Sequence, residues 1–133
     1  MNTIEENHIE SSINVKKTAI TVFRGRVASS LESAKHLLLV TIEDEKIKSR
    51  ELVQLRDEDP LRKIDVIFGL KPDIVICGEL TNVCEYRLRH SNIKIISWVQ
   101  GNVEYILSLC LNNAFIQGYY DESKYQSSYY SHS

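Results

Sequence analysis

The sequence predicts one α/β domain with a mixed β-sheet, and three observations lead to this prediction. The chain has 133 residues, the length of a single domain. Two neighbouring apolar segments with a short charged connection fit an antiparallel pair, and helical and strand patterns then alternate. Since each helix lets the next strand return in the parallel direction, the sheet contains both kinds of pairing. We expect five strands and three helices.

Three strands are predicted in the N-terminal half. Residues 18–23 form a short apolar strand that contains β-branched residues, and Arg24-Gly25-Arg26 is a turn signal. Residues 24–35 are predicted to be a loop. The segments 36–42 and 47–55 fit a β-hairpin, although the usual turn glycine is absent between them.

The first helix and the fourth strand follow. Asp59-Pro60 is typical of an N-cap followed by proline at the first helical position, and Gly69 and Pro72 are expected to end this helix. Residues 73–77 are a compact apolar run before Gly78, which predicts a central strand that is buried on both faces.

Two more helices and one strand complete the predicted domain. Thr81 or Asn82 caps a second helix that extends to about residue 89, and residues 94–99 form the fifth strand. Gly101-Asn102 then caps a third helix, whose buried face includes Cys110. We predict a polar arm over 1–16, the domain over 17–116, and a tail rich in tyrosine and serine over 117–133.

Composition excludes several classes of protein. Sixteen basic and eighteen acidic side chains give a formal charge of -2, which does not favour nucleic acid as a partner. No apolar run approaches the ~20 residues of a membrane span, and the N-terminus lacks the order of a signal peptide. We therefore expect a soluble cytoplasmic protein. The three cysteines form no C-x-x-C pair, so neither a disulfide framework nor a structural zinc site is indicated.

Several short segments occur in the order found in a known family. They are Ala19-Ile20-Thr21-Val22, Gly25-Arg26-Val27, Ser33-Ala34-Lys35, the hairpin, Asp73 to Gly78, and Gln100-Gly101-Asn102-Val103-Glu104. Over Thr18 to Ala114 the chain resembles the dinitrogenase iron-molybdenum cofactor biosynthesis family, the domain type of NifX, NafY and the carboxy-terminal part of NifB. The resemblance implies a ribonuclease-H-like motif, with a five-stranded mixed sheet of order 3-2-1-4-5 and helices on both faces.

The resemblance also implies a function and a site. Family members bind an iron-sulfur precursor of the iron-molybdenum cofactor, or the finished cofactor, and act beside nitrogenase or cofactor-assembly proteins. The loop 24–35 and the turn 77–81 are expected to share one crevice, since open α/β sheets bind ligands beyond the carboxyl ends of their strands. The second helix begins there, and its N-terminus suits an anion. Candidate cofactor-binding residues are Arg24, Arg26, Ser30, Lys35 and Gly78, and candidate metal ligands are Cys77 and His36.

This chain departs from the family pattern at the expected site. Ser29-Ser30-Leu31-Glu32 stands where family members commonly have Pro-His-Phe-Gly, so Ser30 replaces an imidazole. Cys77-Gly78-Glu79 stands in place of Cys-Gly-Gly. A hydroxyl is a poor ligand for soft or borderline metals, and the two carboxylates add negative charge near an anionic cluster.

Each candidate ligand also has a purely structural explanation. Cys77 at the end of a buried strand is either a thiolate ligand or a small apolar residue of the core. His36 is either a metal ligand or a solvent-facing residue at the start of a strand. Cys84 and Cys110 are expected to pack in the core.

Three functional hypotheses remain open from the sequence. The leading one is a non-enzymatic protein that binds or carries an iron-sulfur cofactor. The alternative is a divergent member that has lost the cofactor site and acts as a protein-interaction or regulatory module. A nuclease is disfavoured because the strand 18–23 contains no acidic residue that would bind a divalent cation.

Overall fold

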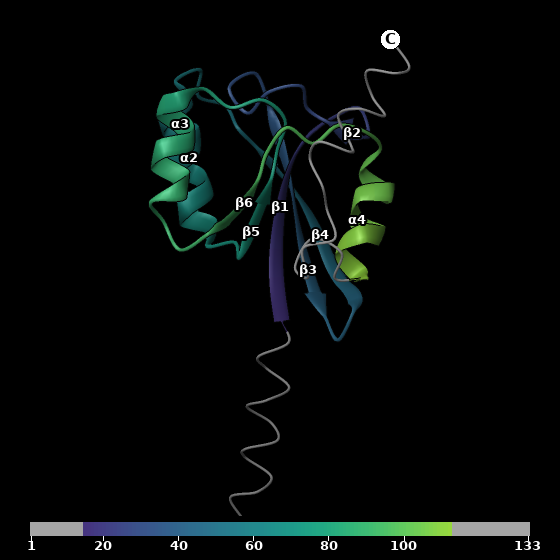
Figure 1. Ribbon diagram of the computed structural model, residues 1–133. Coiled ribbons are helices and arrows are strands. Elements are labelled where there is room, and N and C mark those ends of the chain that lie inside the picture. Colours follow the sequence, from purple (N-terminus) through teal and green to yellow (C-terminus); the bar gives the residue numbers. More distant parts are fainter. Residues whose placement is uncertain (1–14, 113–133) are drawn as a thin grey trace, which may run out of the picture.

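The computed structural model describes residues 15–112, which fold into a six-stranded mixed sheet with three helices (Figure 1). In chain order the elements are β1 (Val15–Phe23), β2 (Arg26–Val27), β3 (His36–Glu43), β4 (Lys46–Gln54), α2 (Pro60–Leu70), β5 (Ile74–Ile76), α3 (Asn82–Arg89), β6 (Lys94–Ile96) and α4 (Val103–Leu111). The strand order is β4-β3-β1-β5-β6, and β2 lies off this path and pairs with β1. The predicted order 3-2-1-4-5 is confirmed, and β2 is an additional short strand inside the predicted loop 24–35.

The central strand β1 joins the antiparallel and parallel halves of the sheet. It pairs antiparallel with β3 and parallel with β5, so that Ala19 lies opposite both Leu39 and Val75. The pair β3 and β4 is antiparallel, and the pair β5 and β6 is parallel. The mixed sheet predicted from the sequence is therefore confirmed.

Both hairpins turn through residues in the left-handed region of backbone conformation. Arg24 (φ 52°) and Gly25 (φ 78°) join β1 to β2, and Asp44 (φ 54°) and Glu45 (φ 66°) join β3 to β4. A two-residue hairpin turn of this type requires positive φ at both positions, and aspartate tolerates it better than most residues. The second hairpin therefore closes without the glycine that such turns usually contain.

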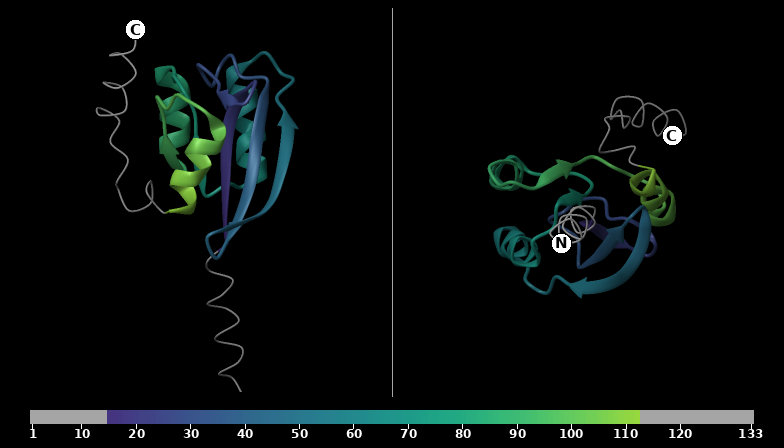
Figure 2. Two further views of the ribbon diagram at one scale, coloured as in Figure 1. Left: turned by 90° about the vertical axis from the view of Figure 1, so that its right-hand side faces the viewer. Right: turned by 90° about the horizontal axis from the view of Figure 1, so that it is seen from below.

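Two apolar layers cover the two faces of the sheet. Helices α2 and α3 lie on one face and α4 lies on the other (Figure 2). Neighbouring residues of β1 point to opposite layers, as the two-residue period of a strand requires. Ala19 belongs to the core that contains Ile64 of α2, whereas Ile20 belongs to the core that contains Ile106 of α4.

Helix α2 begins as predicted and ends between Gly69 and Pro72, the two residues expected to end it. The Asp59 side chain accepts a hydrogen bond from the backbone N–H of Leu61, and proline occupies the first helical position. Gly69 lies inside the last turn, and the chain leaves the helix at Lys71, whose φ and ψ are both 54°. A left-handed residue at this place satisfies the last carbonyl groups, and glycine adopts it with the least steric cost.

Replacing Lys71 by glycine is expected to stabilise the protein by about 0.5–1 kcal/mol. The left-handed conformation costs a non-glycine residue about 1–2 kcal/mol, and the greater flexibility of glycine in the unfolded chain offsets part of the gain. Chemical denaturation measures the change. Lys71→Ala is the control, because alanine removes the same side chain without relieving the backbone, and equal stabilities of the two variants would contradict this explanation.

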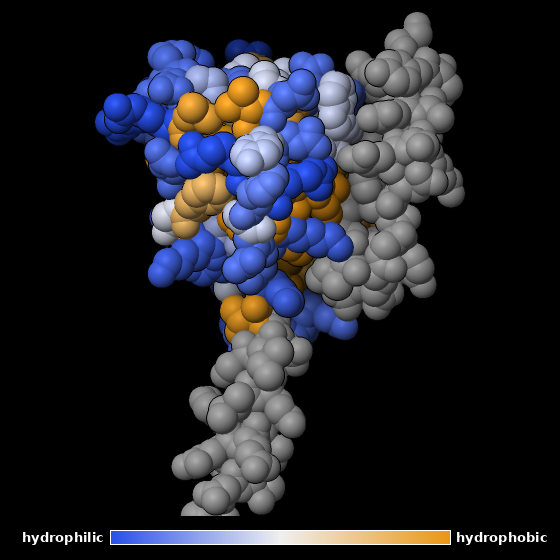
Figure 3. Space-filling view, turned by 60° about the vertical axis from the view of Figure 1, so that its left-hand side comes forward, coloured by the Kyte–Doolittle hydropathy of each residue, from blue (hydrophilic) through white to orange (hydrophobic). Residues whose placement is uncertain are grey.

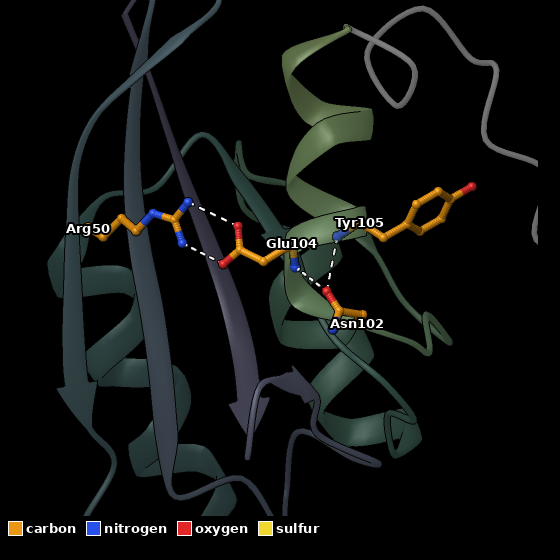
Figure 4. A network of polar contacts seen from close by, with 4 residues as sticks. All are labelled: Arg50, Asn102, Glu104 and Tyr105. Atoms are coloured by element: carbon orange, nitrogen blue, oxygen red, sulfur yellow. Dashed lines mark hydrogen bonds and ion pairs between the residues drawn. The ribbon is translucent and has the colours of Figure 1, made fainter.

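An ion pair fixes the start of α4 against the hairpin. Arg50 on β4 donates two hydrogen bonds, of 2.6 and 3.1 Å, to the carboxylate of Glu104 (Figure 4). The Asn102 side chain accepts from the backbone N–H groups of Glu104 and Tyr105, so the predicted cap of this helix is confirmed. The N-terminus of α4 is thereby held in a defined place beside the sheet.

Two strand ends differ from the predictions by more than one residue. Strand β1 begins at Val15, so Val15 and Lys16 belong to the sheet and not to the predicted arm. Strand β6 ends at Ile96, because Trp98 (φ 64°) leaves the extended conformation expected up to residue 99. The remainder of the arm, residues 1–14, and the predicted tail 117–133 lie outside the described residues. Within residues 15–112 no helix has the length and apolar character needed to cross a membrane.

Candidate functional site

The segment after β2 is bound to the turn after β5 through backbone hydrogen bonds. Glu79 N–H donates to Ser29 O at 2.9 Å, and Leu31 N–H donates to Glu79 O at 3.0 Å. Ser30 and Glu79 form a parallel bridge between these segments. The sequence predicts that the two segments share a crevice, and the structure places them in direct backbone contact.

Gly78 allows this close approach. A Cβ atom built at this position would lie 2.4 Å from the carbonyl oxygens of both Ala28 and Ser29. Real Cβ atoms do not approach backbone oxygen so closely, so only glycine fits here without displacement of the neighbouring chain. Gly78 thus has a structural role at the predicted site.

A buried lysine of α2 donates hydrogen bonds to the same segment. Lys63 of α2 is 3% exposed, and its Nζ donates to Glu32 O at 2.6 Å and to Ala34 O at 2.7 Å. The two carbonyl groups are therefore satisfied by one ammonium group on a rigid helix. Sequence analysis did not identify Lys63, although a lysine beside Ile64 on an apolar helix face is an available signal.

The N-terminus of α3 interacts with a carboxylate of the same chain. Glu32 Oε2 accepts from the backbone N–H of Thr81 at 2.9 Å and from its hydroxyl at 2.6 Å. Partial burial acts to raise the pKa of Glu32, but the hydrogen bonds from Thr81 outweigh it, and the pKa is lowered. The helix end that was expected to suit an anionic cofactor is bound to Glu32, a carboxylate expected to add negative charge near such a cofactor.

Replacing Glu32 by glutamine is expected to lower the stability at pH 7 by about 1 kcal/mol, because the amide retains hydrogen bonding but loses the charge near the helix end. The pKa of Glu32 is lower in the folded state, so its contribution is present above the unfolded pKa of about 4.3. It is lost as the pH falls through the folded value. Urea denaturation from about pH 3 to about pH 7, a range that spans the unfolded pKa, measures the difference.

The control for this prediction is Glu58→Gln, because the Glu58 side chain is 91% exposed and lies 3.9 Å from Lys35. We expect that exposed charge to contribute little. A stability difference between Glu32→Gln and the original chain that stays constant as the solution is acidified would contradict the proposed role of the carboxylate.

Two pockets border the segment 28–35. The first, here called the basic pocket, has a volume of about 520 Å³. It lies between the β1–β2 hairpin, this segment, and the turn before α4. Its lining residues are Phe23, Arg26, Val27, Ala28, Ser29, Ser33, Ala34, Lys35, Gln100 and Gly101. Two cations and no carboxylate belong to this lining.

The second pocket, here called the mixed pocket, has a volume of about 500 Å³. Its lining includes His36 and the basic residues Lys35, Arg56 and Lys63, together with the acidic residues Glu32, Asp57 and Glu58. Lys35 lines both pockets. Residues of the segment 28–35 therefore line a cationic pocket and also a pocket of mixed charge.

The structure brings some of the predicted site residues together and separates others. Arg26 and Lys35 line the basic pocket, and His36 lines the mixed pocket. Arg24 lies in the hairpin turn, with its guanidinium carbon 5.0 Å from the centre of the Phe23 ring. The Ser30 hydroxyl donates to the Ser33 hydroxyl at 2.7 Å.

The two candidate metal ligands occupy different environments. Cys77 is 0% exposed and belongs to the core beneath α2 and α3, whereas His36 is half-buried at the start of β3. Strand β1 lies between β3 and β5, so one whole strand separates the backbones of the two residues. The structure therefore does not place these two side chains in a common site.

The other cysteines pack as predicted. Cys84 and Cys110 are buried, and burial raises the pKa of Cys110 to about 12. Burial also raises the pKa of Cys84, which lies near Glu32 and Thr81. Among residues 15–112, no group of three or more histidine, cysteine, aspartate or glutamate side chains is arranged to hold a metal ion.

Solved structures share this fold. The structure of PH0822 aligns with a TM-score of 0.68 and 17% identity, over 73% of this chain and 89% of that chain. A crystal structure of a protein named "putative dinitrogenase (mj0327)", from Methanocaldococcus jannaschii, aligns with a TM-score of 0.61 and 23% identity, over 74% and 89% of the two chains. An NMR structure of MJ0327 gives the same TM-score and 24% identity, over 74% and 88%. No protein-family model and no curated protein sequence matches the chain.

Proposed function

We propose that this chain is a small non-enzymatic accessory protein that binds an iron-sulfur or iron-molybdenum-type cofactor, or its precursor, as cargo during nitrogenase cofactor assembly. The main supporting observation is that Lys35 and His36 border one pocket while Lys35 and Arg26 border the next. The His36 imidazole and the cations Arg26 and Lys35 thus belong to the linings of the two pockets that border the segment 28–35. The fold shared with MJ0327 is consistent with this role.

The chemistry required of a carrier is reversible binding. A neutral imidazole is a common metal ligand, and His36 is half-buried at the edge of a pocket. Arg26 and Lys35 add positive charge that attracts an anionic cluster. We prefer His36 over Cys77 as the ligand, because the Cys77 side chain would have to leave the core to reach a cluster.

The proposed partners follow from this role. They are nitrogenase or cofactor-assembly proteins that deliver or receive the cargo, in the cytoplasm. Neither nucleic acid nor a membrane is part of the proposal.

Anaerobic gel filtration tests the proposal. The purified chain is mixed with the iron-sulfur cofactor precursor, and iron is measured in the protein peak. We expect near-stoichiometric iron with the original chain and a loss of iron from the peak with His36→Ala, since loss of one metal-ligand bond weakens the affinity at least about tenfold, or by more than 1.4 kcal/mol. His90→Ala is the matched control, because His90 Nδ1 lies 2.8 Å from Tyr86 O and lines neither pocket. Folded protein without iron would reject the carrier role.

One observation favours a second candidate function, an interaction module that has lost the cofactor site. The N-terminus of α3 is bound to Glu32, and Ser30 is bonded to Ser33. Val83 and Tyr86 of α3 are more than half exposed. Figure 3 shows the apolar surface on the side that it presents as separate groups among hydrophilic side chains. Co-purification with an assembly protein, without iron in the complex, would favour this second function.

A further inference from the structure

The basic pocket differs in charge from its neighbour. Arg26 and Lys35 line it, and none of its lining residues is acidic. In contrast, Glu32, Asp57 and Glu58 line the mixed pocket. A pocket that concentrates one sign of charge attracts small ions of the opposite sign. The basic pocket is therefore suited to an anion, even though the whole chain has a formal charge of -2.

Backbone hydrogen bonds join the segments that line this pocket. Val27 N–H donates to Gly101 O at 2.9 Å, and Val103 N–H donates to Gly25 O at 2.9 Å. Arg26 and Asn102 also form an antiparallel bridge. The start of α4 consequently lies beside β2 (Figure 1). The hairpin, the segment before α4 and the segment 28–35 are all held in place before any ligand binds.

Several hydrogen-bond donors of the pocket have no partner within residues 15–112. Arg26 forms no salt bridge there, and no hydrogen bond is made by the Ser29 hydroxyl or the Gln100 amide. The Lys35 ammonium group has only a contact of 3.9 Å to the exposed Glu58. A guanidinium, an ammonium, a hydroxyl and an amide are thus available to one ligand.

We propose that the basic pocket binds a small anion through its carboxylate or phosphate oxygen atoms. Arginine binds both groups through paired hydrogen bonds, and hydroxyl and amide donors complete such contacts. The lining contains no thiol or imidazole that would ligate iron. A volume of about 520 Å³ is within the range of small-molecule sites. This inference deepens the proposed function, on which it rests for its biological setting: the pocket recognises the oxygen-bearing part of the cargo or a separate small anion.

Calorimetric titration in metal-free buffer at low salt tests this inference, with citrate as the polycarboxylate and pyrophosphate as the phosphate. We expect saturable binding of at least one probe, and the tighter probe identifies the chemical source. Arg26→Ala should weaken binding at least about tenfold, because hydrogen bonds to charged groups exceed the 1.4 kcal/mol that corresponds to this factor. Binding should also weaken as salt is added.

Arg56→Ala is the matched control, because Arg56 lines the mixed pocket and its Nε donates to Gln54 Oε1 at 2.8 Å. It should change the affinity less than about twofold, as expected for a charge outside the site. Circular dichroism verifies that each variant is folded. The absence of binding to the folded chain, or equal affinities of Arg26→Ala and the original chain, would overturn the inference.

The titration and the anaerobic gel filtration together separate this inference from the carrier role. Citrate or pyrophosphate binding by a chain that retains no iron would support the anion site and reject the carrier role. Iron retention by a chain that binds neither probe would support the carrier role and overturn the anion site.

Discussion

Replacement of Gly78 by alanine is expected to destabilise the protein by about 3 kcal/mol or more. The new Cβ would lie 2.4 Å from the carbonyl oxygens of Ala28 and Ser29, and both are backbone atoms that hydrogen bonds hold in place. Overpacking of this kind costs about 1–3 kcal/mol, and more where neither neighbour is a flexible side chain. Guanidinium denaturation measures the loss.

Gly69→Ala is a control with the opposite expected sign. Gly69 lies in the last turn of α2, and a Cβ atom there would meet no atom within 4 Å. Alanine is favoured over glycine in a helix by about 0.8–1.0 kcal/mol, and somewhat less near the helix end. If Gly78→Ala were as stable as the original chain, the close contact between the two segments would be incorrect.

Replacement of Lys63 by methionine is expected to destabilise the protein by about 2–4 kcal/mol. Methionine has a similar length and no charge, so the carbonyl groups of Glu32 and Ala34 would lose their common donor. A hydrogen bond to a charged group contributes about 1.5–3 kcal/mol, and a buried carbonyl without a partner adds a further cost. Denaturation gives the total effect, and hydrogen exchange locates it.

The loss at Lys63 should be confined to one region. We expect Lys63→Met to accelerate exchange more at the amides of residues 29–34 than at those of β3. Within the described residues, both carbonyl groups that accept from the ammonium group belong to that segment. Lys48→Met is the control, since the Lys48 side chain is 58% exposed. Unchanged stability and unchanged exchange in Lys63→Met would show that the buried ammonium does not organise the segment.

The sequence predicts elements whose signals are local. The Asp59 cap, the apolar run before Cys77 and the Asn102 cap each depend on a few adjacent residues, and the structure contains all three. The end of α2 also follows from local signals, since the helix ends between Gly69 and Pro72. The residue that leaves the helix is Lys71, and not the glycine that sequence patterns associate with the left-handed conformation.

The site is predicted less completely than the fold. Residue identity indicates that Arg26 and Lys35 are cationic, and the antiparallel pairing of β1 with β2 and β3 brings them to the same end of the strands. The contact of Glu32 with Thr81 spans 49 positions, and that of Lys63 with Glu32 spans 31. The periodicity of apolar residues does not indicate which polar side chain forms a hydrogen bond with a distant loop or helix end. These contacts hold the segment 28–35, which borders both pockets, and they could be found only in the structure.

Titration of ¹⁵N-labelled protein with the iron-sulfur cofactor precursor, followed by amide NMR under anaerobic conditions, tests the carrier proposal most directly. We expect signals of residues 26–36 and of Gln100 and Gly101 to broaden or shift first, because these residues line or adjoin the two pockets. Signals at the hairpin turn Asp44-Glu45 should stay unchanged. Broadening centred away from the segment 28–35, or an unchanged spectrum in the presence of excess precursor, would contradict the proposal.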